Sequence, residues 1–168
     1  MNLSGAAGSE LQILADGRSV TLATPAGAAP GPVVAPVGAA LDVSAGRIVA
    51  DTQLVYPAGR VRLAADDGVE LGANGLIDVS GRRLTLGGAP VDVAGGDVQV
   101  VGRSGAVSFL AGSRVDVSSG GGTAGAGSLR VLGGDAVTLA GDLIGNGPAA
   151  GSSGSFTLTA KNPDGSTN

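Results

Sequence analysis

Residues 61–79 read VRLAADDGVELGANGLIDV, and three short segments within them share one pattern. Val61-Arg62-Leu63, Val69-Glu70-Leu71 and Ile77-Asp78-Val79 each place two aliphatic residues on either side of one polar residue. Successive side chains of a β-strand point to opposite faces, so each segment predicts a short strand with one apolar face and one polar face. Gly, Asp and Asn between the segments favour turns.

The same pattern returns about every 22 residues. The first series consists of Val61-Arg62-Leu63, Leu84-Thr85-Leu86, Val107-Ser108-Phe109 and Leu129-Arg130-Val131, with centres 85 − 62 = 23, 108 − 85 = 23 and 130 − 108 = 22 residues apart. The second series consists of Val69-Glu70-Leu71, Val91-Asp92-Val93, Val115-Asp116-Val117 and Val137-Thr138-Leu139. A third, shorter series consists of Ile77-Asp78-Val79 and Val98-Gln99-Val100. Self-similarity at a fixed period of this length is typical of stacked repeats.

These series predict an all-β fold, namely a right-handed, single-stranded parallel β-helix with about 22 residues and three short strands per coil. Stacking the coils about 4.8 Å apart pairs each backbone with its neighbours and aligns the inward residues into aliphatic columns. We expect Val61, Leu84, Val107 and Leu129 in one column. We expect Val69, Val91, Val115 and Val137 in the next. The alternation also places Val93 in the core and Asp92 in water.

The chain divides into three regions that together predict one structural domain. Residues 1–40 are expected to be an irregular coil with a Pro-rich excursion, because they hold half of the 8 prolines and Pro cannot donate to a sheet ladder. Residues 41–160 carry the β-helix repeats, and residues 161–168 are expected to be a frayed tail. Within the repeats, residues 118–128 and 145–155 are rich in Gly and Ser and predict loops.

Composition excludes several classes of function. The net charge is −4, only one Lys is present and the Arg residues are dispersed, so nucleic acid is not an expected partner. With no His and no Cys, the chain cannot form Ser–His or Cys–His nucleophile pairs or thiolate metal sites. The longest nearly apolar run, residues 33–41, is too short to span a bilayer, so membrane insertion is not expected.

The carboxylates of Glu70, Asp92 and Asp116 are expected to form an outward column, about 4.8 Å apart. Like charges so placed repel each other, and a bound cation would relieve the repulsion. β-Helical pectate lyases use a comparable arrangement with an Arg as base, a role open here to Arg82, Arg83, Arg103 or Arg114. Short turns and a near absence of aromatics argue against a sugar-binding cleft. We therefore expect no catalytic residue, no cofactor and no dedicated metal site.

Several phrases of the form Asp-Val-Ser or Asp-Val-Ala recur: Leu41-Asp42-Val43-Ser44-Ala45-Gly46, Ile77-Asp78-Val79-Ser80-Gly81, Val91-Asp92-Val93-Ala94-Gly95-Gly96 and Val115-Asp116-Val117-Ser118-Ser119-Gly120. Through them residues 41–160 resemble the filamentous haemagglutinin family, the large adhesins of bacterial two-partner secretion. The resemblance implies a non-catalytic stalk that is secreted or held at the bacterial surface, although residues 1–5 carry no signal-peptide pattern. It also implies two partners of the full-length protein, an outer-membrane secretion transporter and a receptor on a host or bacterial cell.

Two alternatives from other classes stay open. One is an enzyme, a β-helical polysaccharide lyase or hydrolase. The other is a module that binds glycans through its Gly- and Ser-rich loops.

Overall fold

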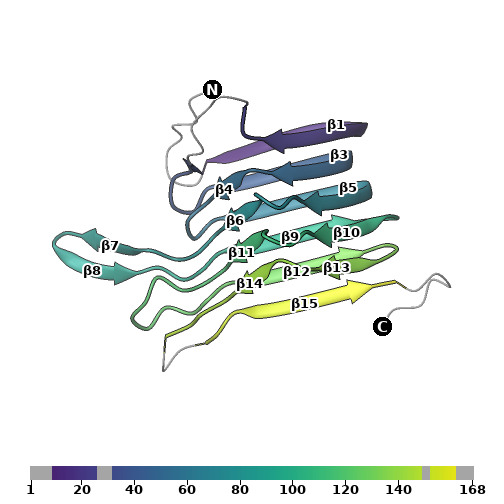
Figure 1. Cartoon of the computed structure of the whole chain (residues 1–168). Helices are drawn as coiled ribbons and strands as arrows, with labels where there is room; N and C mark the ends of the chain where they lie inside the picture. The colour runs from purple at the N-terminus through teal and green to yellow at the C-terminus, as the bar shows by residue number, and fades with distance from the viewer. Residues whose placement is uncertain (1–8, 26–31, 149–151, 162–168) are drawn as a thin grey trace.

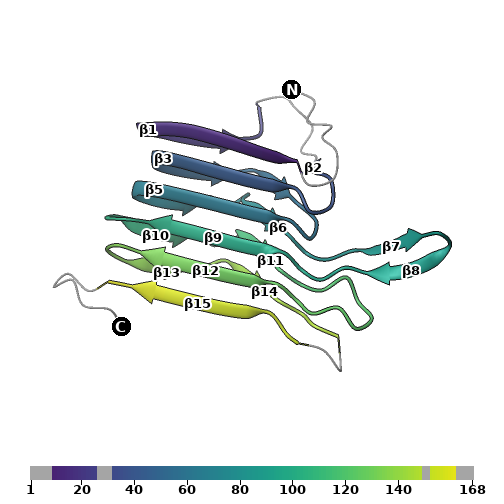
Figure 2. The same cartoon turned by 180° about the vertical axis from the view of Figure 1, so that it is seen from behind.

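The computed structural model describes residues 9–25, 32–148 and 152–161. These residues form β-strands joined by turns and loops and contain no helix, which confirms the all-β prediction. Figures 1 and 2 show the strands stacked in chain order from β1 to β15, with one hairpin projecting to the side.

Most strands belong to two parallel sheets. The first sheet has the order β1 (Glu10–Ala23), β3 (Ala40–Asp51), β5 (Arg60–Leu71), β9 (Asp97–Gly102), β12 (Ser128–Gly133) and β15 (Ser155–Ala160). β10 (Ala106–Phe109) also belongs to it and pairs with β5 and with β13 (Val137–Leu139). The second sheet has the order β14 (Asp142–Ile144), β11 (Arg114–Asp116), β6 (Leu76–Asp78), β4 (Gln53–Val55) and β2 (Val33–Val34). Each pass of the chain thus crosses both sheets and pairs with the pass before it.

The long strands β1, β3 and β5 each bend once. The pairing of β1 with β3 shifts register between Ala15 and Ser19, and that of β3 with β5 shifts between Ala45 and Arg47. Gly46 lies at this bend, where an added Cβ would come 2.8 Å from the carbonyl carbon of Gly17. Later passes build the same two sides from separate strands, β9 with β10 and β12 with β13.

The inward residues of the two sheets form one aliphatic core. Along the first sheet, Leu41, Val61, Val98 and Leu129 are register partners in sequence and are at most 3% exposed. Past the bend, Ile48, Val69 and Val107 form a second buried row. Ile77 and Val115 supply the second sheet. Alternation therefore puts apolar residues inside, as the sequence predicts.

The predicted columns are nevertheless wrong in detail. Leu84 and Val91 lie in an antiparallel hairpin, β7 (Arg83–Leu86) with β8 (Ala89–Asp92), and not in a parallel sheet. Val107 pairs with Val69 and Val137 instead of standing between Val61 and Leu129. Val98 occupies the position in the column that was expected for Leu84, between Val61 and Leu129. Any strand repeats every second residue, so the triplet pattern does not tell a hairpin strand from a strand of the stack.

The even 22-residue step holds only near residues 41–80. The step is 62 − 42 = 20 between Asp42 and Arg62, but 99 − 62 = 37 between Arg62 and Gln99. It is then 130 − 99 = 31 to Arg130 and 157 − 130 = 27 to Thr157. The extra residues form excursions outside the sheets. The paired strands keep the same residues facing inward.

The predicted region boundaries need a similar correction. Residues 10–23, expected to be irregular, form the regular strand β1 and belong to the parallel sheet. Gly-rich loops at 118–127 and, for their described residues, at 145–154 are confirmed. Of the expected tail, Lys161 continues the ladder with a hydrogen bond from its amide to the carbonyl of Gly133 (3.1 Å), and residues 162–168 lie outside the described residues.

We predict that the stability losses of two Leu→Ala variants distinguish the observed register from the one expected. Leu63 is fully buried between Val43 and Val100, so Leu63→Ala should lower the free energy of unfolding by about 2–5 kcal/mol. Leu86, in the hairpin, is 61% exposed, and Leu86→Ala should change it by no more than about 0.5 kcal/mol. Urea denaturation of both variants measures the difference. Equal losses would place Leu86 in the core.

Candidate functional site

Three excursions leave the sheets at the same corner, where the chain passes from the second sheet back to the first. They are residues 79–96 after β6, residues 117–127 after β11 and residues 145–154 after β14, of which 149–151 are outside the described residues. Figures 1 and 2 show them on one side of the stack. We call them the lateral projection. Earlier passes cross this corner through short turns at 35–39 and 56–59.

The hairpin β7–β8 is the largest part of the lateral projection. Its turn is Gly87-Gly88, with φ of 58° and 82°, the left-handed conformation that a two-residue hairpin turn requires. One face carries only apolar side chains, since Leu84 lies opposite Val91 and Leu86 opposite Ala89. The opposite face carries Arg83 with Asp92 and Thr85 with Pro90. The hairpin is therefore an amphipathic ribbon whose apolar face is largely open, as the exposure of Leu86 shows.

A compact polar cluster holds the start of this excursion. Oδ1 of Asp78 accepts hydrogen bonds from the amide (2.8 Å) and the hydroxyl (2.5 Å) of Ser80. Arg82 donates to Oδ2 of Asp78 at 3.1 Å and also to the Ser80 hydroxyl. The side chains of this cluster thus form hydrogen bonds and an ion pair with one another.

The second excursion packs against the base of the hairpin. Nε of Arg83 donates to Oδ1 of Asp92 at 2.8 Å, and this hydrogen bond, followed by the charge of Asp92, raises the pKa of Arg83. Gly122, with φ of 59°, lies against the Asp92 carboxylate so closely that a Cβ there would come within 1.7 Å of Oδ2. The amide of Gly120 donates to the carbonyl of Val93 at 3.1 Å. Both the positive φ of Gly122 and its close approach to Asp92 favour glycine at this position.

The third excursion continues the layering. The amide of Ser119 donates to the carbonyl of Asn146 (2.9 Å), and the amide of Ala126 donates to the carbonyl of Ser152 (3.0 Å). The amide of Asn146 in turn donates to the Ser118 hydroxyl (3.1 Å). Backbone hydrogen bonds thus join all three excursions into one surface feature, with several hydroxyls already used inside it.

Asp116 repeats the arrangement of Asp78 one pass later, and the two residues are register partners. Its Oδ1 accepts from the amide of Ser118 (3.0 Å) and its Oδ2 from Arg114 (3.1 Å). Burial raises the pKa of Asp116, but the hydrogen bonds from Ser118 and the charge of Arg114 outweigh it, so the pKa lies below its usual value. Asp116 is a carboxylate stabilised in its charged form.

The structure does not bring the three predicted carboxylates together. Glu70 lies on β5, paired with Arg47 at 3.2 Å, while Asp92 ends β8 and Asp116 ends β11. The predicted acidic column is therefore wrong, and each of its carboxylates is instead paired with an Arg. Among the described residues there is no group of three or more acidic side chains placed to hold a metal. Val93, expected in the core, is only half-buried beyond the hairpin.

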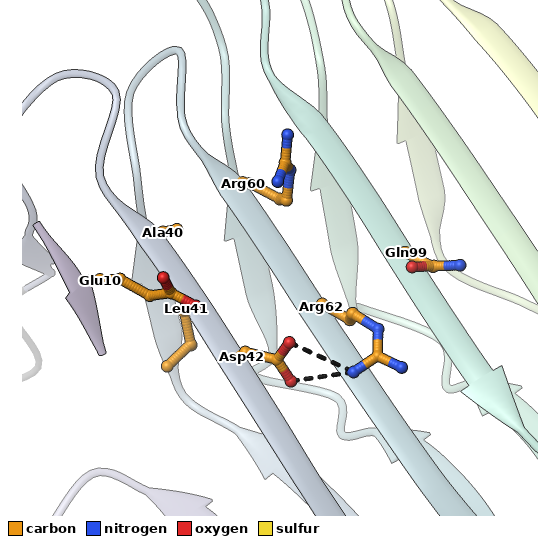
Figure 3. Close-up of a pocket in the computed structure, with 7 residues that line it drawn as sticks. All are labelled: Glu10, Ala40, Leu41, Asp42, Arg60, Arg62 and Gln99. Carbon is orange, nitrogen blue, oxygen red and sulfur yellow. Dashed lines mark hydrogen bonds and ion pairs between the residues drawn. The ribbon is translucent and has the colours of Figure 1, made fainter. Parts of the chain in front are cut away.

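Each arginine proposed as a base is also held by its own acid. The pairs are Arg82–Asp78, Arg83–Asp92, Arg103–Asp66 and Arg114–Asp116. Figure 3 shows a depression on the outer face of the first sheet that holds another such pair, Arg62 with Asp42 at 3.0 Å, beside Gln99. An arginine bound to a carboxylate stays protonated and does not act as a base. These contacts give the lyase interpretation no geometric support.

Ser113 is the remaining polar group of interest. It is 1% exposed, and its hydroxyl has no hydrogen-bond partner within the described part of the chain. It lies against Gly141 of the next pass, where an added Cβ would come 2.1 Å from the hydroxyl oxygen. The Ser113 side chain thus packs tightly against the next pass.

Comparison of the chain with protein-family models, with curated proteins and with solved structures finds no match. In the residues that the structure describes, no helix has the length and apolarity that a membrane crossing requires.

We predict that Asp116 makes stability fall in acid. A lowered pKa contributes stability that is present above the unfolded value of about 3.9 and is lost as pH falls through the folded value. At pH 7, Asp116→Asn should lower the free energy of unfolding by about 1–2 kcal/mol, since it removes charged hydrogen bonds. The difference should begin to shrink as the pH falls below about 4, and the two proteins should converge once the pH lies below the folded pKa of Asp116. Asp135→Asn, at an exposed turn, is the control and should change the free energy of unfolding at pH 7 by no more than about 0.5 kcal/mol.

We predict opposite outcomes for two buried serines. Ser113→Ala should leave the free energy of unfolding unchanged or raise it by up to about 1 kcal/mol, because the hydroxyl loses no partner. Ser80→Ala should lower it by about 1 kcal/mol, because its hydroxyl binds both Asp78 and Arg82. Thermal and urea denaturation measure both. A large loss at Ser113 would reveal a hydrogen bond that the hydroxyl makes in solution.

Proposed function

We propose that the chain is a non-catalytic structural segment of a secreted bacterial surface adhesin similar to filamentous haemagglutinin. Its rod would be a right-handed, single-stranded parallel β-helix with three short strands per coil. The observation that carries the proposal is the strand order. In both parallel sheets the strands follow one another in chain order from one end to the other. A chain that alternates between two such sheets and always pairs with its previous pass is winding along one axis, and parallel crossovers favour the right hand.

Contacts on the outer surface support a mechanical role for the chain. Ion pairs join neighbouring passes of the first sheet: Arg62 with Asp42, Arg47 with Glu70, and Arg103 with Asp66. The inner side is a continuous aliphatic core. In a stacked architecture each repeat depends only on its neighbours, so stability grows with length. Such a segment is suited to provide reach and stiffness to a larger protein.

Export and partners belong to the same proposal. The Asp-Val-Ser phrases within residues 41–160 support a secreted or cell-surface location, with an outer-membrane transporter and a cell-surface receptor as partners of the full-length protein. The segment needs no cofactor for this role. The lateral projection would be the part of its wall that differs from a plain rod.

A glycan-binding module is the second candidate, favoured by the concentration of Ser, Thr, Asn and Gly in the lateral projection. Binding would need free hydroxyl and amide groups there, whereas Ser118, Ser119 and Asn146 are partly committed to each other. A glycan array with the purified chain separates the two candidates. Saturable binding that is lost in Thr123→Ala or Ser153→Ala, two positions on the projection with no side-chain hydrogen bond among the described residues, would favour the module.

The proposed role predicts location and lack of catalysis. Antibodies raised against the purified chain should label intact cells that naturally produce it, and mild protease treatment of those cells should remove the label while a periplasmic marker stays protected. Incubation with pectin, alginate and related acidic polysaccharides, with and without Ca²⁺, should yield no depolymerisation. Label found only after cell lysis would contradict export. Depolymerisation that disappears in Asp92→Asn or Asp116→Asn would establish an enzyme instead.

A further inference from the structure

We infer that Asn74 is a modification site that loses its side-chain ammonia spontaneously, and that Asp51 of the preceding pass protects it in the folded chain. Asn74 belongs to the turn between β5 and β6 and is exposed, while Gly75 next to it is buried. In a flexible chain an Asn before Gly reacts readily, because a residue without Cβ leaves its backbone nitrogen accessible to the Asn side chain. The reaction needs only water.

The reaction begins when the backbone nitrogen of Gly75 attacks Cγ of Asn74. A bond forms between these two atoms, the Gly75 nitrogen loses its proton, and Nδ2 of Asn74 leaves as ammonia. Water then opens the resulting ring at either carbonyl, which gives an aspartate or an isoaspartyl residue with one more carbon in the main chain. The net change replaces the amide by a carboxyl group and raises the mass by about one dalton.

In the folded chain both reacting nitrogens are held in hydrogen bonds that the reaction must break. The amide of Gly75 donates to the carbonyl of Gly72 at 2.8 Å, and this proton is the one that must leave. Nδ2 of Asn74 donates to Oδ2 of Asp51 at 3.2 Å, and this nitrogen is the leaving group. Oδ1 of Asp51 also accepts from the amide of Asn74 at 2.9 Å. Asp51 thus holds both the side chain and the backbone of the residue.

The passes on both sides keep this turn in place. The amide of Gly72 donates to the carbonyl of Ala50 in the preceding pass (2.8 Å), and the amide of Arg114 in the following pass donates to the carbonyl of Gly75 (2.9 Å). A Cβ on Gly75 would come 2.8 Å from the carbonyl oxygen of Ala50, so the backbone is tightly packed here. An isoaspartyl residue would lengthen the main chain inside this stack. The folded state therefore disfavours the product as well as the attack.

The site becomes reactive when these contacts are lost. Local or global unfolding releases the Gly75 nitrogen and the Asn74 side chain together, and the dipeptide then reacts as it would in a flexible chain. An aspartate at this position would face the carboxylate of Asp51, and the like charges would repel each other. The modified fraction at Asn74 therefore records how long the turn has been open. The inference depends on this turn and not on export, so it and the proposed function fail separately.

Peptide mapping by mass spectrometry tests the inference on the full chain. The purified chain is incubated at mildly alkaline pH, and conversion of Asn74 is followed with time, once in buffer and once in urea. We expect conversion in the folded chain to be at least about a hundredfold slower than in urea, because two hydrogen bonds oppose it. Asp51→Ala removes one of them and should raise the rate in the folded chain about tenfold. Asp51→Asn, which keeps the shape of the side chain without its charge, should raise the rate less.

Two controls show whether the effect is local. Asp67→Ala removes an exposed carboxylate with no side-chain hydrogen bond among the described residues, and it should leave the rate at Asn74 unchanged. The same dipeptide occurs at Asn146-Gly147 in the lateral projection, and its rate should be equal in the unmodified chain and in both Asp51 variants. Urea denaturation establishes that each variant is folded under the conditions of the incubation.

Three outcomes would overturn the inference. One is conversion of Asn74 in the folded, unmodified chain at the rate found in urea, which would show that the turn gives no protection. Another is an unchanged rate at Asn74 in both Asp51 variants, which would assign the protection to other contacts. The third is an equal rise at Asn74 and Asn146 in those variants, which would show a general opening of the chain instead of a local contact.

Discussion

Parallel backbone pairing between successive passes is the constraint on which the rest of this structure depends. A single strand is not stable alone, so each strand must pair in register with the strand of the previous pass. The register fixes which side chains face inward, and the row from Leu41 through Val61 and Val98 to Leu129 becomes buried as a consequence. Outward residues are then set side by side as well, which is how Asp42 comes to face Arg62.

The same constraint explains where the chain is free to vary. Between Arg62 and Gln99 it inserts a complete hairpin, yet the two residues remain register partners. The insertion is tolerated because it leaves and returns at a corner, so it changes neither the inward phase nor the ladder on either side. The two loops below the hairpin enter at the same corner and bond to it and to each other. Differences in length between passes are thereby concentrated at one corner of the stack.

Sequence patterns predict the all-β class, the short strands and the Gly-rich loops, but not the register. Leu84-Thr85-Leu86 alternates as well as any strand of the stack, and only the Gly87-Gly88 pair after it signals a hairpin. The candidate carboxylates fail for a related reason. Asp-Val-Ser means a local turn at Asp78 and Asp116, where a strand leaves the sheet, but an inter-strand ion pair at Asp42, inside β3. The same three-residue phrase makes different contacts because the residues of the neighbouring pass determine which partner each Asp has.

In a structure built in this way, successive passes bury one another's inward rows. Each added pass covers the apolar row and the backbone edge of the one before it, and in doing so exposes its own. Phe156 and Leu158, on the last described strand, continue the rows of Leu129 and Val131. The corner excursions lie outside these rows and leave the register of the stacked strands unchanged. The stacked strands and the lateral projection are thus separate parts of the fold.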